Sequence, residues 1–171
     1  MNYFNLFDLP LTFNLKQKDI KNKFYQLQKK YHPDLYMHIE EKKRLHFMQN
    51  SILINKAYQI LKNPITRAEH LISLHQSNIK KKTNCDQYNK FLSFQFYLYE
   101  KLENFKKDNQ YKKINVFYKK ITKIEIYLSN KLQQYLYAKN WEKAKNNLEK
   151  LKYFLKFKIT IEKTMSSIHL Q

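Results

Sequence analysis

The chain has 171 residues, of which 43% are hydrophobic and 27% charged. This apolar content can build a buried core and excludes a wholly disordered chain. The sequence contains no glycine, which excludes a P-loop, a dinucleotide-binding fingerprint and a glycine-built nucleophile elbow, because each needs backbone geometry that glycine adopts at low cost. Three prolines and no glycine also favour an all-α fold, since tight hairpin turns prefer Asn-Gly or Asp-Gly.

The formal net charge of +19 raises the hypothesis of a basic helical nucleic-acid-binding protein. The type of basic residue argues against it, because Arg44 and Arg67 are the only arginines and bidentate recognition of phosphate or guanine favours arginine. Lysine, asparagine, isoleucine, phenylalanine and tyrosine are all abundant, as an AT-biased genome would produce. We therefore interpret most lysines as solvated helix surface and keep nucleic-acid binding as the alternative.

Residues 1–75 carry apolar stripes separated by prolines. A short apolar segment, 3–7, is followed by helical patterns over 15–31, 40–63 and 65–74. Pro33 and Pro64 fall between these patterns, and proline disfavours helix at the residue before it. The stripe of the first helix consists of Ile20, Phe24, Leu27 and Tyr31, and that of the second includes Leu45, Met48, Ile52, Ala57, Tyr58 and Leu61.

Residues 85–171 are predicted to form a three-helix bundle after a polar, aperiodic linker over 76–84. The helices are expected over 86–105, over 111–137 and after Asn140, which is a plausible N-cap. The short junctions between them predict antiparallel neighbours. The first of these helices is apolar on more than one face, more than a three-helix core can bury, which predicts an exposed patch for a partner.

The tripeptide His32-Pro33-Asp34 follows the first long helix directly. Pro33 fixes the backbone as it leaves the helix, and Asp34 then offers a carboxylate suited to a bidentate pair with an arginine of a partner. Placed between two helices that pack antiparallel, the tripeptide resembles the loop of a J-domain. That resemblance implies that His32, Pro33 and Asp34 stimulate ATP hydrolysis by a DnaK-type chaperone.

A basic face precedes this loop. Lys23 and Lys30 are seven residues apart and share one side of the helix, with Lys29 beside them. J-domains usually present such a face to an acidic patch of the chaperone, so the resemblance implies that these lysines steer the encounter. Gln26 occupies a position of this face where many relatives are basic, and a merely solvated face is the alternative.

Two further segments resemble the HscB family of J-domain co-chaperones. They are the opening residues 2–10, NYFNLFDLP, and residues 51–74, which contain NKAYQIL and PITRAEHLISL. The resemblance extends through the linker and bundle, where Trp141 near the start of the last helix is the best anchor. It implies a co-chaperone that delivers the iron–sulfur scaffold protein IscU to the chaperone HscA. A J-domain co-chaperone with another client is the alternative.

The same resemblance implies where the scaffold binds. Leu92, Phe96 and Glu100 lie four residues apart on one helix stripe and match family contact positions, as does Tyr153 on the last helix. Ser93 and Tyr97 differ from the methionine and glutamate of better-studied relatives. The alternative is that the stripe belongs to the core.

We predict no catalytic or metal site, and no cofactor. The single cysteine, Cys85, has no disulfide partner, and neither the pair His70 and His75 nor the pair His38 and His46 has metal-ligand spacing with a third ligand. The N-terminus lacks the basic region of a signal peptide, and no apolar run spans a membrane. We expect a soluble, cytoplasmic protein that is not an enzyme, is monomeric when free, and binds neither nucleic acid nor membrane.

Overall fold

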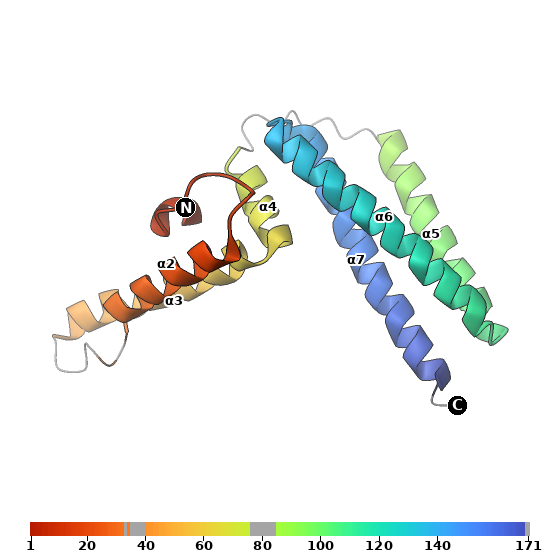
Figure 1. Cartoon of the computed structure of the whole chain (residues 1–171), viewed down its shortest axis with the longest axis horizontal. Helices are drawn as coiled ribbons and strands as arrows, with labels where there is room; N and C mark the ends of the chain where they lie inside the picture. The colour runs from red at the N-terminus through yellow and green to blue at the C-terminus, as the bar shows by residue number, and fades with distance from the viewer. Residues whose placement is uncertain (33, 35–39, 76–84, 170–171) are drawn as a thin grey trace. The chain divides into compact units, whose positions relative to one another are not determined.

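The computed structural model describes residues 1–32, 34, 40–75 and 85–169. Every regular element in these ranges is an α-helix, which confirms the all-α prediction. The chain divides into two compact units, Met1–Gln76 and Ser77–Gln171 (Figure 1). The segment predicted as a linker, 76–84, lies outside the described residues.

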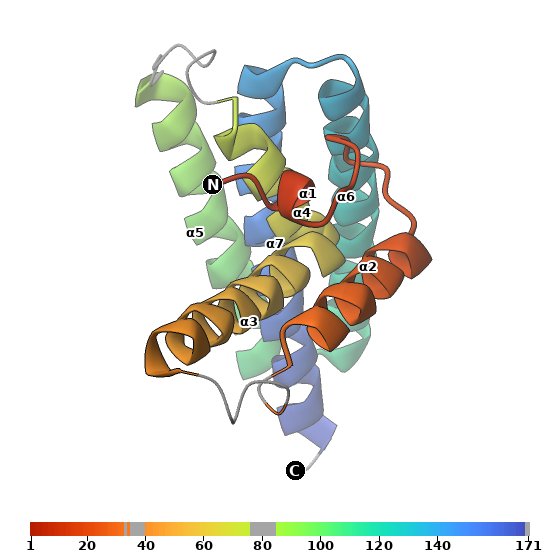
Figure 2. The ribbon, with the colours of Figure 1, turned by 90° about the vertical axis from the view of Figure 1, so that its left-hand side faces the viewer.

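The first unit is built on a helical hairpin. Helices α2 and α3 lie side by side, with α4 packed against α3 and the short α1 against α3 and α4 (Figures 1 and 2). The four helices are α1 (Tyr3–Leu6), α2 (Gln17–Lys30), α3 (Glu41–Lys62) and α4 (Pro64–Ser73). Asn63 begins α4: its side-chain oxygen accepts a hydrogen bond from the Ile65 amide at 2.8 Å, and Pro64 occupies the first turn.

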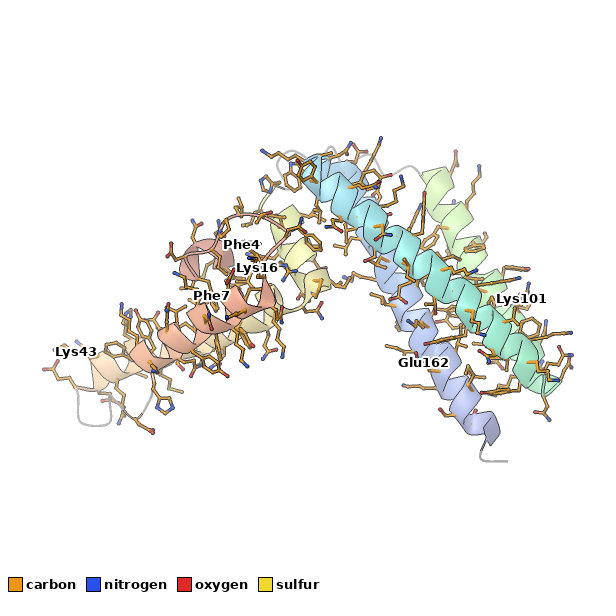
Figure 3. All side chains as sticks on the ribbon, viewed as in Figure 1. Phe4, Phe7, Lys16, Lys43, Lys101 and Glu162 are labelled. Atoms are coloured by element: carbon orange, nitrogen blue, oxygen red, sulfur yellow. The ribbon has the colours of Figure 1, made fainter. Side chains whose placement is uncertain are left out.

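The core of this unit gathers where α1 and α4 cover the C-terminal half of α3. Its fully buried large side chains are Phe4, Phe7, Ile20, Ile54 and Leu61, and Figure 3 labels the two phenylalanines. Leu45, Met48 and Ile52 of α3 are about half exposed, although they belong to the helical pattern that usually marks a core. At 100° per residue they lie on the side of the helix opposite to the buried Ile54 and Leu61.

His70 ties the N-terminal segment to α4. Its Nε2 accepts a hydrogen bond from the Tyr3 amide at 3.1 Å, and its ring stacks on Tyr3 and Phe4 with centroids 4.5 and 5.7 Å apart. Burial, helped by the positive N-terminal amine, lowers the pKa of this imidazole. His70 therefore acts as a neutral packing residue.

The second unit is the predicted antiparallel bundle, with α6 and α7 in the most extensive contact (Figure 1). Its helices are α5 (Cys85–Lys107), α6 (Tyr111–Tyr137) and α7 (Trp141–His169). Asn140 caps α7 as predicted, because its side-chain oxygen accepts a hydrogen bond from the Lys143 amide at 3.2 Å. The buried α6 row is Ile114, Phe117, Ile121, Leu128, Leu132 and Leu136.

Three turns close without glycine. Asp8, Asn109 and Lys139 adopt positive φ of 48°, 51° and 53° at helix ends. Each turn has the two hydrogen bonds of a Schellman motif; after α6, for example, the Asn140 amide donates to Tyr135 and the Lys139 amide to Leu136. A side chain at this position is disfavoured relative to glycine, and least so for asparagine and aspartate. Tertiary packing of the helices offsets that cost.

Candidate chaperone and scaffold surfaces

The loop after α2 presents an imidazole and a carboxylate to solvent. The His32 and Asp34 side chains are 51% and 75% exposed, and Pro33 lies outside the described residues. The Asp34 amide donates to His32 Nδ1 at 3.4 Å. The contact holds the two side chains as neighbours, with His32 Nδ1 and Asp34 Oδ2 3.5 Å apart.

The basic face of α2 is partly neutralised. Lys23 Nζ lies 2.7 Å from Asp8 Oδ2, and the hydrogen bond from Lys23, with its charge, lowers the pKa of the Asp8 carboxyl. Lys29 is exposed, and the Lys30 ammonium lies over the Tyr31 ring, 5.4 Å from its centroid. Sequence reasoning missed Asp8 because it lies 15 residues before its partner. The turn after α1 brings it to α2.

Helix α5 carries the predicted scaffold residues on an exposed row. Leu92 is 37% and Phe96 68% exposed, and Glu100 is also exposed. A phenylalanine this exposed is not part of a core, so the core alternative is wrong for Phe96. Ser93 donates its hydroxyl hydrogen bond to the Asn89 carbonyl within the helix, at 3.0 Å.

Tyr153 is placed differently from this row. It lies between α5 and α7, half-buried, with its ring stacked on Phe157 at 5.8 Å and edge-on to Phe91 at 5.5 Å and Tyr99 at 6.5 Å. Its hydroxyl donates to the Gln95 carbonyl at 3.5 Å, and burial raises the pKa of the phenol. The structure therefore assigns Tyr153 first to packing α5 against α7.

Two kinds of feature are absent from the described part of the chain, a metal-binding cluster and a membrane-spanning helix. It contains no group of three or more His, Cys, Asp or Glu side chains placed to hold a metal ion. None of the helices searched there is long and apolar enough to cross a bilayer. The chemistry available at the loop is ion pairing and hydrogen bonding, and at the α5 row it is apolar burial beside a carboxylate.

Comparison with known proteins identifies both units. Residues 2–70 match the DnaJ domain family, and residues 87–162 match the family described as HSCB C-terminal oligomerisation domain. Co-chaperone protein HscB of Buchnera aphidicola from Acyrthosiphon pisum (strain Tuc7) is 38% identical over 164 residues, 95% of this chain and 94% of that protein. The HscB homolog of Vibrio atlanticus is 36% identical, over 95% of both chains.

Solved structures of HscB proteins have the same fold as this chain. Chaperone HscB from Vibrio cholerae superposes with a TM-score of 0.87 at 33% identity, covering 98% of this chain and 99% of that one. Human co-chaperone protein HscB gives a TM-score of 0.75 at 25% identity, covering 95% of this chain and 81% of that one.

The α2–loop–α3 hairpin, with its exposed His32 and Asp34, and the DnaJ match define a J-domain co-chaperone. The second unit and the full-length similarities narrow this class. The chain belongs to the HscB family, whose members act in iron–sulfur cluster biogenesis. This confirms the predicted family and the predicted role of a J-domain co-chaperone in iron–sulfur cluster biogenesis.

Proposed function

We propose that this chain is an adaptor that brings an IscU-type iron–sulfur scaffold protein to an HscA-type ATPase chaperone. The observation that carries the proposal is that the exposed loop and the exposed apolar row of α5 belong to different folded units. One unit is thus able to bind the chaperone while the other holds the client. The adaptor has no enzymatic activity of its own, acts as a cytoplasmic monomer and needs no cofactor; the cluster is cargo of the scaffold.

At the chaperone, the Asp34 carboxylate pairs with an arginine. Its exposure leaves it in water before binding, so the pair gains its strength only when the interface excludes solvent. Lys29 and Lys30 add positive charge on the preceding helix and accelerate the encounter with an acidic surface. Lys23 contributes less, because Asp8 already neutralises it at 2.7 Å.

At the scaffold, Phe96 is the anchor. A ring that is 68% exposed offers most of its surface for burial, and full burial of a phenylalanine is worth about 1.5–3 kcal/mol. Leu92 extends the apolar row, and Glu100 at its end selects a cation on the partner. Tyr153 supports the row from beneath by holding α5 against α7.

The test is steady-state ATP hydrolysis by an HscA-type chaperone, with and without this protein and with and without IscU. We expect stimulation that is synergistic with IscU and lost in His32→Gln. Phe96→Ala should remove the synergy and keep the stimulation without IscU. Tyr127→Ala is the matched control, because Tyr127 is 60% exposed on α6, away from the row.

Each other outcome has a distinct meaning. Stimulation that IscU never enhances would keep the J-domain and point to another client. Absence of stimulation, together with RNA binding that survives physiological salt, would favour the nucleic-acid alternative. Equal effects of Phe96→Ala and Tyr127→Ala would refute the α5 row as the scaffold surface.

A further inference from the structure

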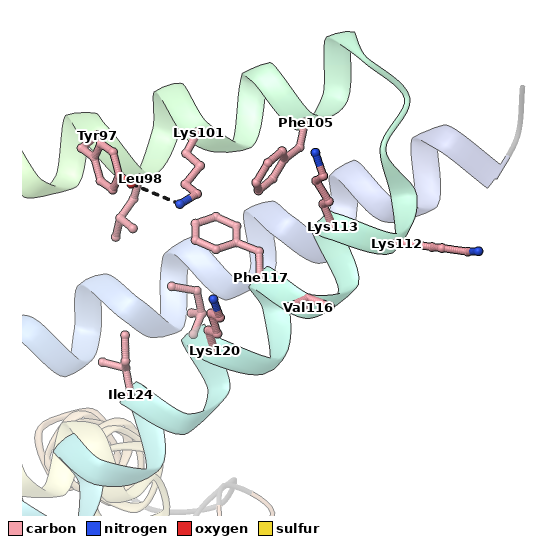
Figure 4. Close-up of a pocket in the computed structure, with 11 residues that line it drawn as sticks. Tyr97, Leu98, Lys101, Phe105, Lys112, Lys113, Val116, Phe117, Lys120 and Ile124 are labelled. Atoms are coloured by element: carbon pink, nitrogen blue, oxygen red, sulfur yellow. Dashed lines mark hydrogen bonds between the residues drawn. The ribbon is translucent and has the colours of Figure 1, made fainter.

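A second apolar surface lies on the other side of α5, in the groove between α5 and α6. Figure 4 shows its residues, which enclose about 440 Å³. The floor is formed by Leu98 and Phe105 of α5 and by Phe117 and Ile121 of α6. Val116, at 54% exposure, forms part of the open edge. Most of the groove lies on another side of α5 than the row: Lys101 and Phe105 are five residues on from Phe96 and Glu100, which is about 140° around a helix, and Tyr97 lies between the two surfaces.

The rim of this groove carries lysines and no acidic side chain. Lys101, Lys112, Lys113 and Lys120 all belong to the lining. Lys101 extends toward Tyr97, whose hydroxyl lies 3.1 Å from its Nζ, and in Figure 4 Lys112 extends away from the groove. Lys113 and Lys120 are exposed and stand on the α6 side. An apolar floor with a cationic rim is complementary to an apolar stripe flanked by carboxylates.

The length of the groove fits a helix. Its lining runs over 97–105 of α5 and 112–124 of α6, and at 1.5 Å per residue these segments are about 12 and 18 Å long. This is two to three turns of an α-helix, the span over which i, i+4 and i+7 anchors enter a groove in helix-in-groove recognition. A docked helix would lie along α5 and α6 as a fourth element of the bundle.

We propose that the α5–α6 groove docks an acidic amphipathic helix of a partner protein. Leucine-type side chains of that helix enter the floor, and its glutamates or aspartates pair with Lys113 and Lys120. A second copy of this chain, with a net charge of +19, is less complementary to the cationic rim than an acidic helix. Because residues 87–162 match a family described as an oligomerisation domain, self-association is an outcome that the test distinguishes. Lys113 and Lys120 belong to α6 and the scaffold row to α5, and only Tyr97 of the lining falls among the candidate scaffold positions, so we expect both partners to bind together.

The probe is a fluorescent synthetic helix of about four turns with leucine at i, i+4 and i+7 and glutamates beside them, added to the full-length protein. We expect saturable binding that Lys113→Glu/Lys120→Glu weakens about tenfold. Lys145→Glu/Lys156→Glu is the control, since it changes net charge equally at exposed positions of α7, outside the groove. Val116→Asn, at an exposed edge position, should also weaken binding without unfolding the bundle.

Charge exchange completes the test. A peptide with lysines in place of the glutamates should bind the Lys113→Glu/Lys120→Glu variant better than the original protein. Equal losses in the two double variants would overturn the proposal, because they would show attraction to net charge alone. Binding to phosphatidylglycerol vesicles but not to the peptide, or self-association through the groove in sedimentation, would likewise overturn it. Scaffold binding should be unchanged in all these variants.

Discussion

Phe96 and Tyr153 are both predicted scaffold contacts, but their different burial predicts different losses of folding stability when each is replaced by alanine. Phe96 is 68% exposed, so about a third of its surface is buried, or about 65 Å² of an aromatic side chain. At 25 cal/mol per Å² the loss is about 1.5 kcal/mol, and the better helix propensity of alanine returns about 0.5 kcal/mol. We expect Phe96→Ala to lower the free energy of unfolding by about 1 kcal/mol.

Tyr153→Ala should cost more. It removes a half-buried ring that contacts Phe91, Tyr99 and Phe157, each ring pair adding about 0.5–1.5 kcal/mol to the area term. We expect a loss of about 3 kcal/mol, at the lower end of aromatic-to-alanine changes in cores. For a unit of this size each kcal/mol lowers the unfolding midpoint by about 4–8 °C.

Trp141 makes the comparison direct. It is the only tryptophan and begins α7, so its fluorescence reports unfolding of the second unit. Thermal melts followed by this signal should show a small shift for Phe96→Ala and a large one for Tyr153→Ala. Tyr153→Phe, which keeps the ring and loses only a 3.5 Å hydrogen bond, should stay close to the original protein. Equal shifts for the two alanine variants would refute the division into contact and packing residues.

Two further predictions concern the first unit. Because burial lowers the pKa of His70, its stabilising contribution is complete above the unfolded pKa of about 6.5 and is lost as the pH falls through the folded value. NMR titration of its ring should therefore give a midpoint below 6.5, and a higher midpoint would contradict the buried, neutral role. Asp8→Asn should release Lys23 and lower the concentration of this protein that half-maximally stimulates the chaperone. Lys23→Ala in the same background should reverse that gain. No effect of Asp8→Asn would show that Lys23 is not part of the chaperone surface.

The helices were predictable from local signals, and the partners of side chains were not. α6 has the predicted bounds, because its apolar row recurs every three or four residues and short turns border it. The exposed side of α3 was not predictable in the same way: Leu45, Met48 and Ile52 have helical spacing, but they lie opposite to the buried Ile54 and Leu61. Periodicity identifies an apolar face and leaves open whether another element covers it.

The candidate site likewise contains some features that the sequence predicts and others that only the structure shows. The His32–Asp34 loop was predictable because its residues are adjacent in sequence, whereas the Lys23–Asp8 pair depends on a turn in which Asp8 adopts positive φ. Tyr153 and Phe96 are both aromatic residues on amphipathic helices. Only the positions of Phe91, Tyr99 and Phe157 around Tyr153 distinguish the packed ring from the exposed one.

Lysine is the residue for which composition was least informative. Compositional drift toward lysine predicts that these side chains are spread over solvated helix faces. At most positions, the location of a lysine gives no reason to assign it a binding role. At the α5–α6 groove, however, Lys113 and Lys120 border an apolar floor whose lining contains no acid. Compositional drift accounts for the abundance of lysine but not for a binding role at the groove. Reversing the charge of Lys113 and Lys120 at the groove, and of Lys145 and Lys156 on α7 as the control, separates local binding from net charge.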